Sequence, residues 1–505
     1  MTGRYIAGTI LLMLTCTTHG EVVLRMDADR VESPLAVPYR RVGTLRPRAA
    51  SEIRNSNWTL GCECLDRDFV DFEQYKHFIA PLGIKTVRLQ AGWAKSEKVR
   101  GQYDLAWLDK VVDYLISQGI NVLMETSYGN PIYKGGGGAS LSMGIPTGEE
   151  GLAAWDRWIE TLSRHYATRV RDWAMWNEPD NSPVNTPELL ADFNARTAKI
   201  IRRNIPNARL AGLSLAESDP KFFGACLECL GEDAKLFDWF IYHGYQKAPE
   251  DSYESVEKLK AVLADYAPKA EMRQGENGCP SDYTGEFALW YVPWSEYSQA
   301  KWDMRRMLGD LGHDVESAVF TCCDFNHIGR GMNTKGLLRA NSKHEVIGVK
   351  RAYYAVQNVV SVFDDTLERV RDKAVKAADP TIVAYEYRKK DGRSVYAFWK
   401  SANDLVAKPA EIPVIYKILP FVDPPRHRPI MRPVHVRPGD SFELHPIELV
   451  AQGKPMKDPV WVDLMTGRVY EFPKDSLAPD GEAVRYFNVP AYDSPCLLTE
   501  RSVVL

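Results

Sequence analysis

The sequence DLAWLDKVVDYLISQGINVLMET, residues 104–126, contains a complete amphipathic helix followed directly by a strand. Leu108, Val112 and Leu115 recur at helical spacing, which predicts one apolar face. The apolar run at 121–126 predicts a buried strand. A helix that leads at once into a buried strand is typical of parallel α/β proteins.

The same alternation of short apolar runs and amphipathic stretches extends over about 300 residues on either side of this segment. No glycine-rich phosphate-binding sequence follows the first strand, which argues against a doubly wound nucleotide-binding sheet. The sequence therefore predicts an α/β fold, a (β/α)8 TIM barrel over residues 57–362. The predicted strands are 58–63, 85–90, 121–126, 172–178, 209–214, 239–245, 271–276 and 317–323.

Helical periodicity ends after the barrel. Alternating runs such as TIVAYEYR and SVYAFWK are separated by Gly, Pro, Asn and Asp, which predicts an all-β, β-sandwich-like domain over residues 363–505. Within it, residues 408–440 are rich in proline and arginine and are predicted to form a long loop. Residues 21–56 form an N-terminal extension that either adds strands to this domain or covers the barrel floor.

The N-terminus is typical of a secretory signal peptide over residues 1–20. Arg4 precedes an apolar run that ends at Leu14 and is too short to span a bilayer. We expect a secreted or periplasmic protein, with a lipid anchor on Cys16 as the alternative. Since no later stretch contains 18 apolar residues, we expect no other association with a membrane.

Composition excludes several classes of partner. The 505 residues include 63 Lys+Arg and 67 Asp+Glu, so no overall basic field exists to attract nucleic acid. The cysteines lack the histidine spacing of a zinc site, and we expect neither a metal nor a cofactor.

Cys62 and Cys64 end the first strand, and Cys322 and Cys323 end the eighth. Because these strands are neighbours in a closed barrel, we predict one disulfide between the two pairs.

Two glutamates end predicted strands at the expected catalytic edge of the barrel. Glu178 lies in WAMWNEPDN (173–181) on the fourth strand, and Glu276 ends the seventh. Strict alternation places Trp176 on the same face as Glu178, whereas a purely structural interpretation makes Glu178 a helix cap. Two carboxylates across a barrel mouth are the groups that hydrolyse a glycosidic bond.

The two carboxylates are expected to differ in protonation. Arg88 ends the second strand and Tyr245 the sixth, and both can stabilise an ionised Glu276. Trp176 and the other apolar neighbours of Glu178 should desolvate that carboxyl group and raise its pKa. Glu178 is therefore the predicted acid and Glu276 the predicted anion.

These residues together resemble the clan A retaining glycoside hydrolases. The resemblance rests on Trp-Asn-Glu-Pro at 176–179, His-Gly-Tyr at 243–245, Arg88 and Glu276. Within the clan, residues 87–129 resemble most the family 39 enzymes, the xylosidase and iduronidase group, in which a β-sandwich follows the barrel.

The resemblance implies double displacement with retention on an oligosaccharide or polysaccharide. It assigns Glu178 as acid/base and Glu276 as nucleophile, with Arg88 and Tyr245 orienting Glu276. It implies that Asn177 binds the hydroxyl beside the anomeric carbon and that His243 lines the pocket.

One departure concerns the sugar platform. These enzymes usually carry a tryptophan at the end of the eighth strand, where this chain has TCCDFNHIGRG, so Phe325 or His327 is the candidate substitute. Trp93 and Tyr128 follow strands two and three and could stack on sugar rings, with core packing as the alternative.

Two further functions are compatible with the sequence. One is a catalytically silent barrel that binds carbohydrate, against which the presence of both glutamates argues. The other is a different clan A activity, such as that of a glucosidase, galactosidase, mannanase or glucanase.

Overall fold

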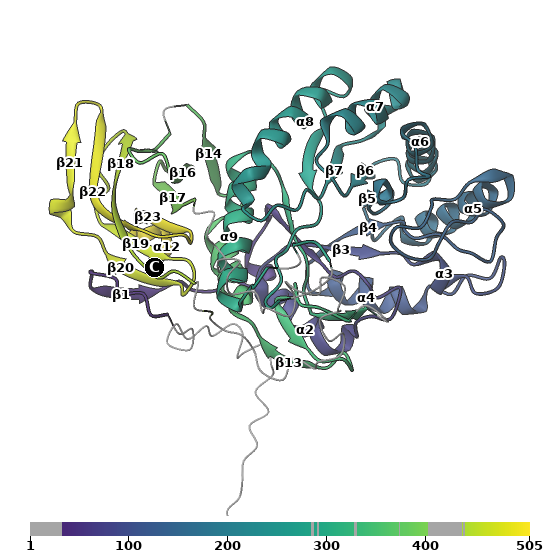
Figure 1. Cartoon of the computed structure of the whole chain (residues 1–505), viewed down its shortest axis with the longest axis horizontal. Helices are drawn as coiled ribbons and strands as arrows, with labels where there is room; N and C mark the ends of the chain where they lie inside the picture. Colours follow the sequence, from purple (N-terminus) through teal and green to yellow (C-terminus); the bar gives the residue numbers. More distant parts are fainter. Residues whose placement is uncertain are drawn as a thin grey trace, which may run out of the picture.

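The computed structural model consists of an α/β barrel and an antiparallel β domain, which lie side by side (Figure 1). In the part of the chain that the structure describes, no helix is long and apolar enough to cross a membrane. The predicted signal peptide over residues 1–20, with Cys16, lies outside the described residues, as does most of the predicted loop at 408–440. The described residues are 33–283, 287–289, 292–327, 331–372, 374–401, 437 and 440–505.

Eight parallel strands form the barrel, in the order β8-β7-β6-β5-β4-β3-β2-β9. Parallel bridges from Arg273 to Glu316 and from Asn277 to Val319 bring β8 beside β9 and nearly close it. This confirms the predicted (β/α)8 architecture. The strands are β2 (Trp58–Gly61), β3 (Thr86–Gln90), β4 (Asn121–Glu125), β5 (Asp172–Ala174), β6 (Arg209–Leu215), β7 (Trp239–Tyr242), β8 (Glu271–Gln274) and β9 (Ser317–Val319).

Helices surround the barrel and bury their apolar faces against it. In the first of them the Asp71 carboxylate accepts a hydrogen bond from Glu73 N, and Gly83 ends the helix in a left-handed conformation with φ of 88°. The major helices are α2 (Phe72–Leu82), α4 (Ala106–Ser117), α5 (Gly148–Tyr166), α6 (Pro187–Asn204), α7 (Pro220–Leu230), α8 (Tyr253–Tyr266), α9 (Glu296–Gly312) and α10 (Arg351–Val362), with a short α3 (Trp93–Ser96).

The catalytic-edge ends of several strands are shorter than the sequence predicts. β5 ends at Ala174, so residues 175–178 leave the ladder, and Glu178 adopts a left-handed conformation with φ of 45°. Trp176 therefore packs outward against Trp155 of α5, with ring centroids 5.6 Å apart. The prediction that Trp176 shares a face with Glu178 is wrong, because strand alternation holds only while the backbone stays extended.

Two hairpins follow β9 before the last barrel helix. β10 (Phe325–His327) pairs with β11 (Gly331–Asn333), and β12 (Leu338–Ala340) pairs with β13 (Val346–Val349). Both pairs are antiparallel, and the first brings Phe325 and His327 to the mouth of the barrel.

The β domain contains a seven-stranded and a four-stranded antiparallel sheet. Fully buried Phe398, Trp461 and Tyr486 belong to the apolar cluster that these strands enclose. The seven-stranded order is β1 (Arg41–Thr44), β20 (Arg468–Glu471), β19 (Pro459–Asp463), β23 (Cys496–Glu500), β17 (Ser394–Lys400), β16 (Ile382–Lys389) and β14 (Leu367–Val370); the four-stranded order is β15 (Lys376–Ala377), β18 (His445–Gln452), β22 (Ala483–Ala491) and β21 (Leu477–Asp480).

The N-terminal extension contributes to both parts of the molecule. Its strand β1 pairs with β20 at the edge of the larger sheet. Its short 3-10 helix η1 (Ala50–Glu52) lies at the opposite end of the barrel from the catalytic edge, where Lys85 Nζ donates to Ala50 O at 2.8 Å.

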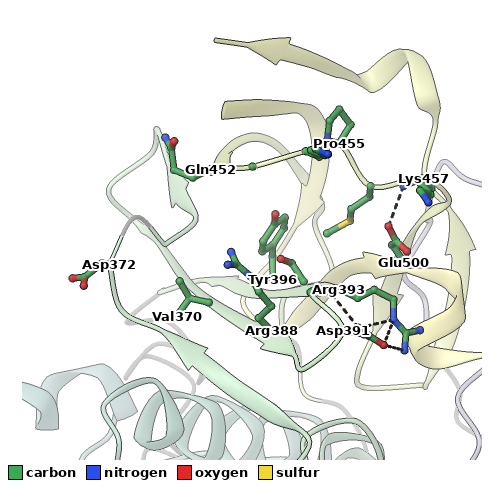
Figure 2. A pocket seen from close by; sticks show the side chains of 15 residues that line it. Val370, Asp372, Arg388, Asp391, Arg393, Tyr396, Gln452, Pro455, Lys457 and Glu500 are labelled. Carbon is green, nitrogen blue, oxygen red and sulfur yellow. Dashed lines mark hydrogen bonds and ion pairs between the residues drawn. The ribbon is translucent and has the colours of Figure 1, made fainter. Parts of the chain in front are cut away.

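A cavity opens on the β domain, far along the chain from the glutamates. It lies between the β16–β17 hairpin and the β18–β19 loop, with Tyr396 in its wall (Figure 2). Several of its charged groups are paired: Arg393 binds Asp391 at 2.6 Å, and Lys457 N donates to Glu500 at 3.1 Å.

All eight described cysteines are free, so the predicted disulfide between the 62/64 and 322/323 pairs is not formed. The strands are neighbours as predicted, and the thiols of Cys62 and Cys322 are hydrogen-bonded to each other. Adjacent strands bring the residues together, but the buried thiols remain reduced in this structure.

Candidate active site

A pocket opens at the carboxyl ends of the barrel strands. Its walls come from the strand ends, the β8–α9 loop and the β10–β11 hairpin. The lining residues are Glu63, Cys64, Arg67, Gln90, Tyr128, Leu141, Asn177, Glu178, Tyr245, Glu276, Phe287, Ala288, Phe320, Phe325, His327, Asn333 and Lys335.

Glu178 is held at both of its carboxylate oxygens. Its Oε1 lies 2.7 Å from His243 Nδ1, and its Oε2 accepts from Asn181 Nδ2 at 2.8 Å. Its backbone N donates to Ser214 O at 2.8 Å, in a segment of β6 where the register of the ladder shifts. The irregular ends of β5 and β6 therefore position this carboxylate.

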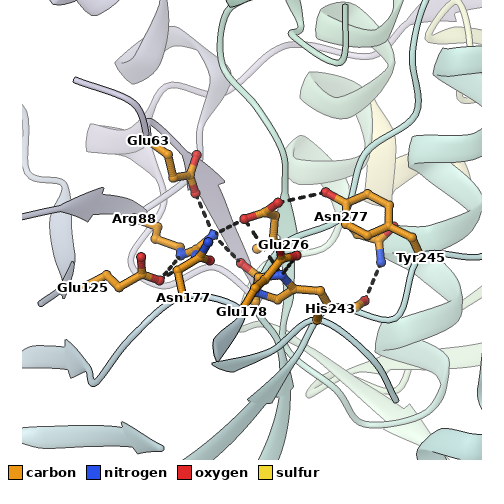
Figure 3. Close-up of polar contacts among 12 residues, drawn as sticks. Glu63, Arg88, Glu125, Asn177, Glu178, His243, Tyr245, Glu276 and Asn277 are labelled. Atoms are coloured by element: carbon orange, nitrogen blue, oxygen red, sulfur yellow. Dashed lines mark hydrogen bonds and ion pairs between the residues drawn. The ribbon is translucent and has the colours of Figure 1, made fainter. Parts of the chain in front are cut away.

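Glu276 binds two donors that favour its anion. Arg88 Nη1 donates to Oε2 at 2.8 Å, and the Tyr245 hydroxyl donates to Oε1 at 3.1 Å (Figure 3). Tyr245 follows the neighbouring strand β7, whereas Arg88 reaches Glu276 from β3 across the barrel. These are the two residues predicted to orient Glu276.

The two glutamates lie close together. One oxygen of each carboxylate and one ring nitrogen of His243 lie within 4.8 Å of one another. His243 Nδ1 is 2.7 Å from Glu178 and 3.9 Å from Glu276, so the imidazole lies beside both. Carboxyl groups about 5 Å apart permit direct attack on a sugar, whereas inverting enzymes need roughly 6.5–9.5 Å to accommodate a water molecule.

The surroundings shift the two pKa values in opposite directions. Burial raises the pKa of Glu178, and the nearby charge of Glu276 adds to it, against the hydrogen bond from His243. Burial also opposes ionisation of Glu276, but His243, Arg88 and Tyr245 outweigh it and lower that pKa. One carboxyl group is thus suited to hold a proton and the other to be anionic.

Arg88 lies beside Glu276 and contacts three carboxylates (Figure 3). Besides Glu276, its Nη1 donates to Glu63 Oε1 at 2.9 Å, and its Nε donates to Glu125 Oε2 at 3.0 Å. Its Nη2 donates to Asn177 Oδ1. Burial raises the pKa of Glu63 to about 7, which Arg88 opposes and Glu276 reinforces. Arg88 therefore connects the strand ends on this side of the site.

All but one of the predicted site residues fall into two groups. Asn177, Tyr128 and Phe325 line the pocket with the glutamates and Tyr245, and Asn177 Nδ2 donates to the Tyr128 hydroxyl at 2.7 Å. Arg88 and His243 are almost completely buried, with exposures of 1% and 0%, and bind the glutamates from behind.

Trp93 is not brought to the pocket. It is fully buried, stacks on Tyr133 with centroids 5.7 Å apart and contacts Trp155 and Trp158. The expectation that Trp93 binds sugar is therefore corrected: left-handed Gly92 turns the chain at the end of β3, and the indole packs among aromatic rings of the core.

Several polar residues of the pocket were not anticipated. Glu63 lines the pocket, and fully buried Glu125 binds Arg88 behind it; both lie at strand ends, so the rule that identified Glu178 could have found them. Arg67 and Lys335 lie in loops, where no periodic sequence pattern indicates a functional site.

The group of Glu178, His243 and Glu276 has the side chains of a possible cation site. The guanidinium of Arg88 already binds Glu276 at 2.8 Å, and its positive charge opposes a metal ion at the same carboxylate. The donor set is thus better explained by proton chemistry than by metal binding.

The barrel, with carboxylates at its strand ends and a β domain beside it, is a fold that this chain shares with solved glycoside hydrolases. A family model for glycoside hydrolase family 42, described as beta-galactosidase, matches residues 71–132. A search of curated proteins gives no match.

Solved glycosidases share this fold at low sequence identity. A family 30 endoxylanase from Clostridium papyrosolvens C71 is 10% identical, with 91% of this chain and 98% of that chain covered and a TM-score of 0.55. A monomeric beta-xylosidase from Caulobacter crescentus CB15 is 15% identical, with 91% and 97% covered and a TM-score of 0.53. A family 39 enzyme from Xanthomonas axonopodis pv. citri is 16% identical, with 90% and 95% covered and a TM-score of 0.51.

Proposed function

We propose that the protein is a retaining glycoside hydrolase of clan A, with family 39 as its affiliation. The observation that carries the proposal is the pair Glu178 and Glu276, which lie within 4.8 Å and have pKa values displaced in opposite directions. Similar folds in an endoxylanase and a beta-xylosidase support this class of reaction.

In the proposed reaction, ionised Glu276 attacks the anomeric carbon while protonated Glu178 gives its proton to the leaving oxygen. A covalent glycosyl–Glu276 ester forms as the glycosidic bond breaks. Glu178, now ionised, then removes a proton from water, which attacks the anomeric carbon and releases Glu276. Arg88 and Tyr245 stabilise the carboxylate that departs in this second step.

Hydrolysis of aryl glycosides and polysaccharides tests the proposal. The full chain should release product with retained configuration, observed by NMR of the first-formed anomer. Glu276→Ala and Glu178→Ala should each lower kcat/KM by at least about 1,000-fold, since each removes a group that bonds to reacting atoms. Azide should restore turnover of activated substrates in Glu178→Ala by replacing the water that needs a base.

Glu271→Ala is the matched control, because Glu271 lies exposed at the opposite end of the strand that precedes Glu276. It should retain full activity. An inverted first product, or normal turnover by Glu276→Ala, would contradict the proposal. Binding of glycans without hydrolysis would favour the silent carbohydrate-binding alternative.

We also propose export of the chain, on the basis of the apolar run after Arg4. N-terminal sequencing of the protein recovered from outside the cytoplasm should begin near residue 21, and recovery with Met1 intact from the cytoplasm would contradict it.

A further inference from the structure

Lys335 lines the same pocket as Glu178 and Glu276, although it lies in the loop after β11. Its residue is only 2% exposed. Its backbone is held in place, since its carbonyl oxygen accepts from Gln299 Nε2 at 3.1 Å. The side chain is therefore part of a built pocket wall.

The ammonium group of Lys335 differs from those of the other buried lysines in the described chain. Lys350 forms an ion pair with Asp324 at 2.6 Å, and Lys301 forms one with Asp493 at 2.5 Å. Lys335 has no hydrogen-bond or ion-pair partner for its Nζ among the described residues. It is the one described buried lysine whose charge faces the pocket without an ion-pair partner from the described part of the chain.

Two aromatic rings flank this ammonium group. Its Nζ lies 5.6 Å from the ring centroid of Tyr245 and 5.8 Å from that of Phe287. Burial lowers the pKa of Lys335 to about 8, with Glu276 and Glu178 opposing the shift, so the group is still mainly protonated at pH 7. Aromatic faces stabilise a cation less than an anion or bulk water does, so the charge still lacks a full partner.

We propose, on the basis of the glycosidase function above, that the substrate sugar carries an anionic group, a carboxylate or a sulfate, which Lys335 binds. The anion would supply the partner that the buried ammonium does not find among the described residues. A neutral sugar would displace water from Lys335 and provide only hydroxyl groups, which leaves the charge poorly compensated.

The placement of Lys335 indicates which sugar carries the charge. Tyr245, which its ammonium faces, donates to Glu276 at 3.1 Å. The anionic group thus belongs to the residue whose anomeric carbon faces Glu276. The pocket cation Arg67 already pairs with Asp66 at 3.2 Å, so its charge has an anionic partner without a ligand.

Matched ligands test this inference by binding, which does not depend on turnover. Methyl glycosides of glucose, galactose and mannose are each compared as the neutral sugar, the 6-carboxylate and the 6-sulfate, by titration calorimetry of the full-chain Glu276→Gln variant. In at least one series the carboxylate or the sulfate should bind about 10- to 100-fold more tightly than the neutral sugar. Comparison of the 6-carboxylate with the 6-sulfate in each series shows whether the bound group is a uronate or a sulfate ester.

Lys335→Met in the same background should abolish this preference, whereas Lys335→Arg should retain most of it. Lys343→Met removes an exposed lysine from the neighbouring loop and should change nothing. Thermal unfolding of each variant establishes that it is folded. Equal or absent binding of every anionic ligand, or a preference that survives in Lys335→Met, would overturn the inference.

The two proposals fail separately. Hydrolysis of a neutral glycoside by the wild-type chain, with no anionic preference, would overturn the anionic-substrate inference and leave the glycosidase intact. The opposite result is that Lys335→Met abolishes anion binding but the wild-type chain hydrolyses none of the bound sugars. It would overturn the proposed glycosidase activity and leave the proposed anion-binding site intact.

Discussion

At the level of single residues, the proposed proton chemistry depends on which groups contact each of two buried glutamates. Both are largely desolvated, which alone would raise both pKa values. Glu276 escapes this because the nearby charge of His243 and the hydrogen bonds from Arg88 and Tyr245 favour its anion, whereas Glu178 has the imidazole and an amide as partners. Removing one donor to Glu276 should therefore move the acidic limb of the pH profile of kcat/KM and leave the basic limb in place.

Tyr245→Phe removes a hydrogen bond to the Glu276 anion and should raise the pKa of that carboxyl group. Because the nucleophile must be ionised, the acidic limb of kcat/KM should move to higher pH by about one to two units, from roughly 1.5–3 kcal/mol per charged hydrogen bond. The basic limb, set by loss of the Glu178 proton, should stay near its original position. A full pH–rate profile measures both limbs.

Tyr128→Phe is the matched control for that variant. The Tyr128 hydroxyl lines the same pocket and accepts from Asn177, but it is not hydrogen-bonded to Glu276. Its loss should weaken substrate binding with the acidic limb unmoved. An equal shift in both variants would show that the tyrosine hydroxyls act through general polarity and not through Glu276.

At the level of elements, the irregular ends of β5 and β6, more than the regular strands, determine the position of Glu178. β5 stops at Ala174 and β6 changes register after Gly212, and Glu178 is anchored on Ser214 between them. The other element that departs from simple expectation is β1, which joins the β domain although it precedes the barrel in the sequence. Leu45 follows β1 and is buried, with 3% exposure.

Leu45→Ala should lower the free energy of unfolding by about 2–5 kcal/mol, as for other buried leucines that leave a cavity. The adjacent Arg46→Ala should cost no more than about 1 kcal/mol, because its pair with Glu52 is exposed. Denaturant unfolding followed by tryptophan fluorescence measures both. Equal effects would mean that the extension packs less closely than its burial indicates.

At the level of the whole molecule, the β domain is joined to the barrel by buried polar contacts. Lys301 of α9, on the side of the barrel toward the β domain, pairs with Asp493, with side-chain exposures of 1% and 5% (Figure 1). Trp399 Nε1 of β17 donates to Glu250 Oε1 at 2.6 Å. One apolar cluster also includes residues of both parts. We infer that barrel and β domain unfold together.

Asp493→Asn leaves Lys301 as a buried charge without its anion, and should lower the free energy of unfolding by about 3–5 kcal/mol. Asp480→Asn breaks an exposed pair with Arg485 in the same domain and should cost at most about 1 kcal/mol. The two variants are compared by denaturant unfolding. A first transition confined to the β domain in Asp493→Asn would contradict cooperative unfolding of the two parts.

Much of the fold was predictable because periodicity records which side of an element is buried. The helical spacing in 104–119 and the apolar run in 121–126 establish a β/α unit without reference to any other segment. Strand-end position likewise singled out Glu178 and Glu276. These are local properties, and they survive any error of a few residues in the boundaries of the elements.

What only the tertiary structure decided depends on segments far apart in the chain. Whether Trp93 reaches a sugar or the core, and whether β1 joins the β domain, follows from packing that no local pattern contains. That the Lys335 ammonium has no partner among the described residues is of the same kind, because partners come from segments far apart in the sequence. The sequence by itself determined the barrel and its two glutamates; long-range packing determined the surroundings that tune them.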